Sequence, residues 1–332
     1  MLIAMPLSGN HTAYGQVKGT KTPADQIAAL YDGLRQSHLN DFDVMLSGYI
    51  PSAEAVEEVG KIGRELRYSS TMKPGSFFWV FDPVMGDNGR LYVAEEIVPA
   101  YKSLLREADL ILPNQFEAET LSGVKITDLS SLVKAIEALH HTYQIPHILI
   151  TSLRLSTSNA TLPTNSLTTD DVLTVIGSTR RADHSPRLFR IDIPAYPIFF
   201  SGTGDMLAAL TVARLREAVF AAGLQKTAHW LSPDDVEPAE LPLAKATEKV
   251  LASMQAVLAK TAAAMEVELK ASEDADEKAL GTRSTEENGA ADEAKRKHLM
   301  KTKAAEVRVV RNVEDLRNPP DIEGFRAKPL EF

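Results

Sequence analysis

The sequence predicts an α/β fold in which helices cover both faces of a mostly parallel central sheet. Short runs that are apolar throughout alternate along the chain with segments that repeat apolar residues at helical spacing. Each apolar run is followed by Gly, Pro, Asp or Ser, as expected where a buried strand ends. Strands and helices that alternate in this way form parallel sheets with helices on both sides.

The first half of the chain contains four predicted strands and the four helices between or beside them. The strands are residues 44–48, 77–81, 109–112 and 147–151. The helices are residues 22–38, 53–67, 94–107 and 128–143. In the last of these, Leu132, Ile136 and Leu139 share one face. The pair His140-His141 lies on the same helix with no acidic partner nearby in the sequence, and we expect it at the surface. Active sites in such sheets lie at the carboxyl ends of the strands.

The second half is less regular. It contains a Ser/Thr-rich loop at 153–170, a hairpin formed by 172–176 and 188–193, helices at 205–219 and 243–269, and a returning strand at 307–310. The helix at 205–219 is apolar almost all round and is therefore expected to be buried. The sequence shows no internal repeat, and we predict one domain over residues 1–332.

A charged segment at 270–304 interrupts this pattern. Residues 266–293 hold ten acidic and three basic side chains, and residues 295–303 hold five basic ones. Apolar residues are too scarce there to offset the entropy of ordering the chain. We predict a flexible, solvated insertion within the domain.

Composition excludes several classes of protein. The 332 residues include no cysteine, which excludes disulfides, thiolate zinc sites and a thiol nucleophile. The net charge of −9 argues against nucleic acid as a partner. No continuous apolar run approaches the roughly 20 residues that span a bilayer, and the opening residues lack the pattern of a signal peptide. We expect a cytoplasmic protein without a membrane partner, with the nucleus as an alternative location.

The strongest local motif is Gly202-Thr203-Gly204-Asp205, at the start of the helix predicted for 205–219. Glycines let the backbone approach a ligand, and the N–H groups at a helix start favour an anion such as phosphate. An acid beside such an anion hole can take the proton of an attacking hydroxyl group. On this motif alone, Asp205 is equally consistent with a charge that only stabilises the helix start. Leu207 stands where a dinucleotide-binding motif has a third glycine, and no Walker motif occurs.

Polar residues follow three of the predicted strands. They are Asp82 and Asp87, then Asn114 and Glu117, then Thr151 and Ser152. Each group alone has an ordinary structural explanation, such as an Asp-Pro turn or a helix cap. At one edge of a sheet, however, their oxygen atoms suit Mg²⁺ bound to nucleotide phosphates.

These motifs, with Asn10-His11-Thr12 and Ser47-Gly48-Tyr49, occur in the order found in pyridoxal kinases, which the sequence therefore resembles over about residues 7–260 and 305–317. The resemblance implies the ribokinase-like three-layer fold and ATP-dependent phosphorylation of the 5′-hydroxymethyl group of pyridoxal, pyridoxine and pyridoxamine. It also implies Mg²⁺, a potassium or sodium ion and a homodimer.

The resemblance assigns roles to individual residues. The implied base is Asp205, and the implied anion hole is formed by Gly202, Thr203 and Gly204. The vitamin is expected to bind at Thr12 and Tyr49, and the cations near Asp87 and Glu117. ATP is expected to bind at Asp82, Asn114, Thr151, Ser152, Thr203 and Tyr196.

The sequence departs from the family in two places. The family begins with a strand and a helix whose first loop supplies a Ser to the vitamin ring, and no residue here corresponds to that Ser. A unit of roughly 30–40 residues is expected to be missing. Leu112 also stands where the family often has Thr, which removes a hydroxyl group from the monovalent-cation site.

Two other functions remain open. A kinase for hydroxymethylpyrimidine belongs to the same superfamily, although Asn10-His11-Thr12 and Tyr49 argue against it. A catalytically impaired nucleotide-binding relative would be consistent with the missing unit, whereas the intact Gly202–Asp205 motif argues against it.

Overall fold

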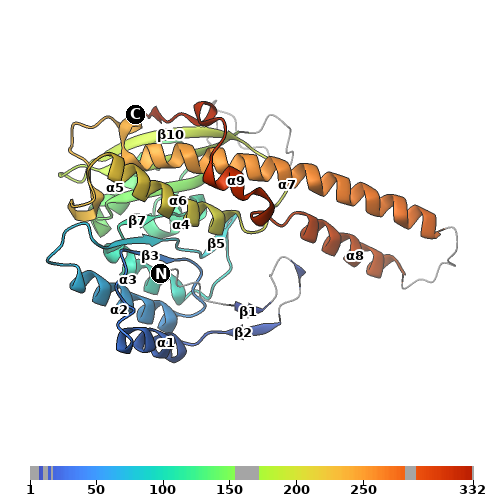
Figure 1. The fold of residues 1–332 in the computed structure, drawn as a ribbon, viewed down its shortest axis with the longest axis horizontal. Coiled ribbons are helices and arrows are strands. Elements are labelled where there is room, and N and C mark those ends of the chain that lie inside the picture. Colours follow the sequence, from blue (N-terminus) through green and yellow to red (C-terminus); the bar gives the residue numbers. More distant parts are fainter. Residues whose placement is uncertain (1–6, 10–13, 16–17, 154–171, 281–288, 331–332) are drawn as a thin grey trace.

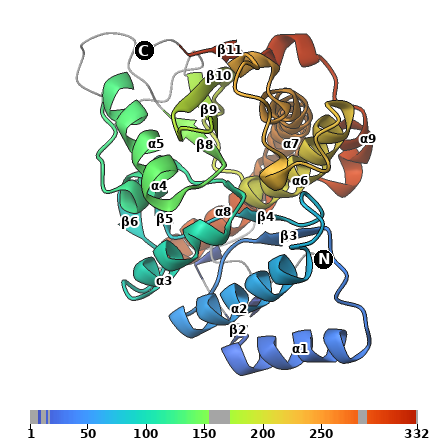
Figure 2. The ribbon, with the colours of Figure 1, turned by 90° about the vertical axis from the view of Figure 1, so that its left-hand side faces the viewer.

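Apolar residues on both faces of the central strands place one sheet between two layers of helices. The computed structural model describes residues 7–9, 14–15, 18–153, 172–280 and 289–330. In β4 (Phe78–Phe81), Trp79 and Phe81 face one apolar core, while Phe78 and Val80 face the other. Figure 2 shows α1 to α5 along one face of the sheet and α6 and α7 along the other. The fold is therefore a three-layer α/β/α sandwich, as predicted.

The described part of the chain contains one seven-stranded sheet in the order β11-β10-β9-β8-β7-β4-β3. Four strands pair in parallel: β3 (Val44–Ser47), β4, β7 (Leu110–Ile111) and β8 (His147–Leu153). Three continue the sheet in antiparallel pairing: β9 (Val172–Arg180), β10 (Pro186–Pro194) and β11 (Lys328–Pro329). Two small hairpins lie outside it, β1 (Leu7–Gly9) with β2 (Gly19–Lys21) and β5 (Gly86–Asp87) with β6 (Arg90–Leu91). The predicted hairpin at 172–193 therefore belongs to the main sheet.

The six helices predicted from the periodicity of the sequence are all present, and the described residues contain three further α-helices that were not predicted. Those of the first layer are α1 (Ala24–Gln36), α2 (Ala53–Ser69), α3 (Ile97–Leu104), α4 (Gln115–Ser122) and α5 (Leu129–Tyr143). Those that follow are α6 (Thr203–Ala221), α7 (Pro242–Leu280), α8 (Gly289–Ala304) and α9 (Val313–Arg317). The loop predicted at 153–170 lies almost wholly outside the described residues.

Only one face of α6 is buried, although the sequence predicted burial all round. Met206, Leu207, Leu215 and Val219 pack into the second core, while Phe220 is half exposed. Alanine at several of the remaining positions made the helix look uniformly apolar, but alanine is small enough to lie at the surface at little cost.

Most of residues 270–304 are helical, which corrects the solvated loop that we predicted. The segment contains the end of α7 and all of α8, and Figure 1 shows both projecting away from the sheet. Its Ala, Glu and Lys residues have high helix propensity, and Glu293 forms an ion pair of 2.7 Å with Lys297 one turn later. Extending the core helix α7 also avoids the cost of nucleating a new one. The flexibility of this arm stays a prediction.

The strand predicted at 307–310 is wrong. Glu306 forms one isolated bridge with Ser201, and a short 3₁₀ helix begins at Val310. Val310 is 87% exposed, so its β-branched side chain has no sheet to pack against.

An 18-residue stretch within residues 242–272 of α7 is long and apolar enough to span a membrane, at a mean hydropathy of 1.2. Half of this stretch is buried inside the protein, and Val250 and Val257 pack in the second core. The stretch therefore has the properties of a core helix. Our sequence analysis found no such run because Lys260 and Glu266 interrupt it.

His140 is buried in α5, which corrects our prediction of a surface position. Its Nδ1 donates to the carbonyl oxygen of Ile145 at 2.7 Å, because a carbonyl oxygen can only accept. Its Nε2 then accepts from the hydroxyl group of Ser178, also at 2.7 Å. Burial lowers the pKa of His140 to about 3, so the ring is neutral in the folded protein at neutral pH.

We expect His140 to make stability depend on pH. The unfolded imidazole takes up a proton near pH 6.5, whereas the folded one stays neutral until about pH 3. As the pH falls from 6.5 to 3, this group alone should therefore lower the free energy of unfolding by about 1.4 kcal/mol per pH unit. Urea unfolding of the wild type, His140→Gln and the exposed-neighbour control His141→Gln at several pH values measures the difference. His140→Gln should show the shallower slope, and equal slopes in all three proteins would contradict the assignment.

Candidate active site

Parallel pairing brings the carboxyl ends of β4, β7 and β8 to one edge of the sheet. Asp82 directly follows β4, and its backbone N–H donates to the carbonyl of Ser47 at 2.8 Å. Asn114, after β7, forms a parallel bridge with Thr151 in β8. The structure thus brings together Asp82, Asn114 and Thr151, as predicted from their positions at strand ends.

A side-chain network fixes the geometry of this edge. Glu117 accepts backbone hydrogen bonds from Met85 at 2.8 Å, from Gly86 at 3.4 Å and from Asn114 at 2.9 Å. Asn114 caps α4 by accepting from the backbone of Glu117, and its amide donates to the carbonyl of Gly86. The loop after β4 is thereby joined to the start of α4.

Carboxylates crowd this part of the site. Burial, together with the nearby charges of Glu117 and Asp205, raises the pKa of Asp82 well above its usual value. Burial raises the pKa of Glu117 to about 7, although three backbone N–H groups oppose the shift. Asp87 adds to that increase. Because such charge effects act over short distances, Asp82, Glu117, Asp87 and Asp205 lie near one another. A cation among them would relieve the repulsion between carboxylates.

The start of α6 has the geometry expected of an anion site. Gly202 is the N-cap residue and has a φ of 90°, in the left-handed region that favours glycine. Space for a Cβ atom is open at both Gly202 and Gly204, so a ligand can approach the backbone closely. Thr203 is partly buried, and Asp205 is exposed in the first turn. The helix dipole adds a partial positive charge at this end.

A cavity of about 350 Å³ adjoins these strand ends. It is lined by Asp87, Asn88, Gly89, Asn114, Gln115, Phe116, Glu119, Lys125 and Ser152. Ser152 has a φ of 59° beside an irregularity in the pairing of β8 with β9. Such bulges change the direction in which side chains point near active sites. The cavity thus includes three of the predicted site residues, Asp87, Asn114 and Ser152.

Tyr49 and Tyr196, predicted on the vitamin and adenine sides, lie outside the lining of this cavity. Tyr49 is half-buried and packs against the first core. Tyr196 is also half-buried, in edge-to-face contact with Phe200 at 5.7 Å between ring centroids. Thr12, like Asn10 and His11, lies outside the described residues.

Sequence analysis missed two features of the site. Lys125 lines the cavity from the loop after α4. The only signal for it in the sequence is its position six residues after Glu119. Tyr14 donates a hydrogen bond to Glu306, which raises the pKa of Tyr14 to about 12. Glu306 is bridged to Ser201, just before the anion site. No local signal could predict a contact between residues 14 and 306.

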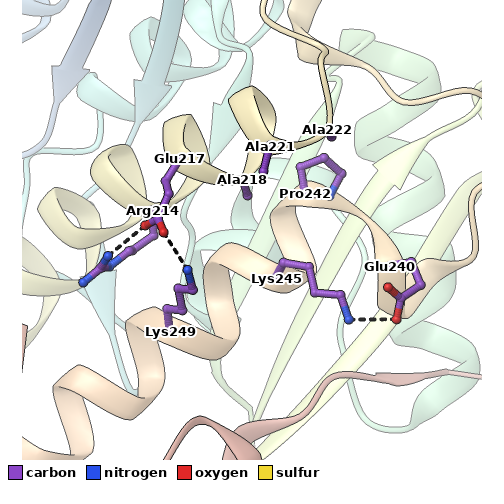
Figure 3. A pocket seen from close by; sticks show the side chains of 9 residues that line it. All are labelled: Arg214, Glu217, Ala218, Ala221, Ala222, Glu240, Pro242, Lys245 and Lys249. Atoms are coloured by element: carbon purple, nitrogen blue, oxygen red, sulfur yellow. Dashed lines mark hydrogen bonds and ion pairs between the residues drawn. The ribbon is translucent and has the colours of Figure 1, made fainter. Parts of the chain in front are cut away.

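A second cavity, of about 300 Å³, lies beside the C-terminal half of α6, beginning about 18 Å along the helix from Gly202. Figure 3 shows that ion pairs account for its charged lining. Glu217 pairs with Arg214 at 2.8 Å and with Lys249 at 2.6 Å, and Lys245 pairs with Glu240 at 2.7 Å. It contains no predicted site residue and is explained by these structural pairs.

Comparisons with known proteins agree with the fold and the site. A family model described as Phosphomethylpyrimidine kinase matches residues 39–222. A Schizosaccharomyces pombe relative in the pyridoxal kinase family is 35% identical over 257 residues, which are 76% of this chain and 73% of that protein. The human pyridoxal kinase is 35% identical over 213 residues, which are 61% of this chain and 64% of the human protein.

A solved structure of similar fold is that of Leishmania donovani pyridoxal kinase in complex with ADP and pyridoxamine. Its TM-score is 0.67 at 26% identity, and the match covers 98% of this chain and 88% of that one. Fold and site together define a ribokinase-like kinase. The chain belongs to the pyridoxal kinase family.

The two glycines of the anion site should respond differently to alanine. Gly202→Ala forces an L-residue into the left-handed region and should destabilise the protein by about 1 kcal/mol. Gly204→Ala replaces a helical glycine in open space and should stabilise it by up to about 1 kcal/mol. Urea unfolding of both variants measures the contrast. Equal effects of the two substitutions would show that Gly202 is not under conformational constraint.

Proposed function

We propose that this chain transfers the terminal phosphoryl group of ATP to the 5′-hydroxymethyl group of pyridoxal, pyridoxine and pyridoxamine. The observation that carries the proposal is the placement of Asp205 in the first turn of α6, beside the open backbone of Gly202–Gly204 and within electrostatic range of Asp82. The Leishmania donovani relatives of known structure, solved with ADP and pyridoxamine or with ADP and pyridoxine, support the substrate class.

In the proposed reaction, Asp205 accepts the proton of the substrate hydroxyl group. The hydroxyl oxygen then bonds to the γ-phosphorus, and the bond from that phosphorus to the bridging oxygen breaks, so that ADP leaves with both electrons of the bond. Backbone N–H groups at the start of α6 stabilise the negative charge on the transferring group. The exposed position of Asp205 leaves room for a hydroxyl group to approach.

We also propose that Mg²⁺ accompanies ATP. Burial raises the pKa values of Asp82 and Glu117, and neighbouring carboxylates add to both increases, so a cation at this place would be favourable. Within the described residues, no three acidic or histidine side chains are arranged to hold a metal by themselves, so phosphate oxygens would complete its shell. Bound Mg²⁺ would neutralise phosphate charge.

Other implied properties rest on the family resemblance. A monovalent cation has weaker support, because the side chain of Leu112 is buried in the second core and offers no oxygen ligand. A homodimer and a cytoplasmic location stay predictions. So do the vitamin-binding roles of Thr12 and Tyr49 and the adenine-side role of Tyr196.

Asp205→Asn should bind ATP and lose turnover. General-base catalysis contributes about 10²–10⁴-fold, and the amide cannot accept the proton. Steady-state assays with pyridoxal, together with ADP titration, separate catalysis from binding. Asp32→Asn, on the exposed surface of α1, is the matched control. A rate within a few-fold of wild type would mean that Asp205 only stabilises the helix start.

The description of the matching family keeps hydroxymethylpyrimidine as a second candidate substrate. Parallel assays of the wild type with pyridoxal and with hydroxymethylpyrimidine decide between them by kcat/KM. A wild-type chain that binds ADP but phosphorylates neither compound would instead be the catalytically impaired relative.

A further inference from the structure

The candidate site has many anionic groups and few cationic ones. The residues assigned to ATP, to the cations and to catalysis are neutral or acidic, and Asp82, Asp87, Glu117 and Asp205 are the acidic ones. A nucleotide brings a strongly negative phosphate chain to the same place. Among the nine residues that line the cavity of 350 Å³, only Lys125 is basic. The charge balance of the site therefore depends on this residue.

Lys125 is held at the rim of the cavity without being buried. Its ammonium group pairs with the carboxylate of Glu119, and its side chain is 74% exposed. Glu119 is only 8% exposed and is fixed by two further hydrogen bonds, from the backbone of Ile126 at 3.1 Å and from Gln115 at 3.2 Å. An ammonium group has three donors, so the pair with Glu119 leaves others for a ligand.

The cavity also connects Lys125 with the groups that the site offers to phosphate. Asn114 and Ser152 line the same cavity, and Gln115 begins α4, whose N-terminus favours an anion. We propose that Lys125 is a ligand of the nucleotide phosphates, anchored by Glu119 in a position from which it reaches them. This inference rests on the proposed function and deepens it by assigning the cation that binds the phosphate chain.

A purely structural ion pair is the competing explanation, and the two make opposite predictions. If the pair only stabilises the loop after α4, then Lys125→Met and Glu119→Gln break the same interaction and should have similar effects. If Lys125 binds phosphate, Lys125→Met removes the ligand, whereas Glu119→Gln removes its competitor for the ammonium group. The amide oxygen of Gln at position 119 can still accept from Ile126, so the loop keeps a local hydrogen bond.

The experiment is calorimetric titration of the full chain with ADP and Mg²⁺ at fixed ionic strength. We expect Lys125→Met to weaken ADP binding about tenfold, Lys125→Arg to stay within about threefold of wild type, and Glu119→Gln to bind ADP at least as tightly. Lys134→Met, at an exposed position in α5 outside the cavity lining, should match wild type. In turnover assays, Lys125→Met should raise the KM for ATP by a similar factor and change kcat less than about threefold.

Wild-type ADP affinity in Lys125→Met would overturn the proposal, as would equal losses in Lys125→Met and Glu119→Gln with a lowered melting temperature in both. The titration needs no vitamin, so it decides the role of Lys125 even if the wild type fails to phosphorylate pyridoxal. A wild-type chain that binds no ADP would overturn this inference together with the proposed function.

Discussion

The hydrogen bonds of Glu117 to three backbone N–H groups are the constraint on which the site depends. They join the loop after β4, at Met85 and Gly86, to Asn114 at the end of β7. Asn114 is in turn bridged to Thr151 in β8. One carboxylate thus sets the relative positions of three strand ends and of the N-terminus of α4. Because buried backbone N–H groups are costly to leave unpaired, these hydrogen bonds stabilise the arrangement of the strand ends.

A second buried carboxylate has the same role at the opposite edge of the sheet. Asp109 directly precedes β7 and accepts from the backbone of Trp79 at 2.7 Å, from Arg67 at 2.6 Å and from His229 at 2.5 Å. The Arg67 and His229 partners lower the pKa of Asp109 despite its burial. Only two residues of β7 are in ladder pairing, and the side chains of Asp109 and Asn114 add hydrogen bonds at its two ends.

The sequence was sufficient to predict the parallel strands, most of their covering helices and the edge at which polar residues gather, but it did not predict that β9, β10 and β11 extend the same sheet. Apolar runs such as 77–81 and 147–151 are buried on both faces, so their composition alone distinguishes them. His140 was misplaced because its hydrogen-bond partners, Ile145 and Ser178, lie on other elements. The sequence did not reveal Lys125 or the contact of Tyr14 with Glu306 for the same reason, because both depend on residues that lie on other elements. The arm at 270–304 was predicted as a loop because helix propensity was given less weight than missing apolar surface.

Asp109 and Glu117 differ in how their charge is balanced. This difference distinguishes a carboxylate that stabilises the fold from one at the candidate site. Asp109 faces Arg67 and His229, and its pKa is lowered. Burial raises the pKa values of Glu117 and Asp82, and neighbouring carboxylates add to the increase. A protein gains stability from the first arrangement and loses it in the second. A fold retains unfavourable charge of this kind where ligand binding relieves it, because a cation or a protonated group that binds only the folded state returns the lost free energy. We therefore expect ligands to bind at this edge of the sheet.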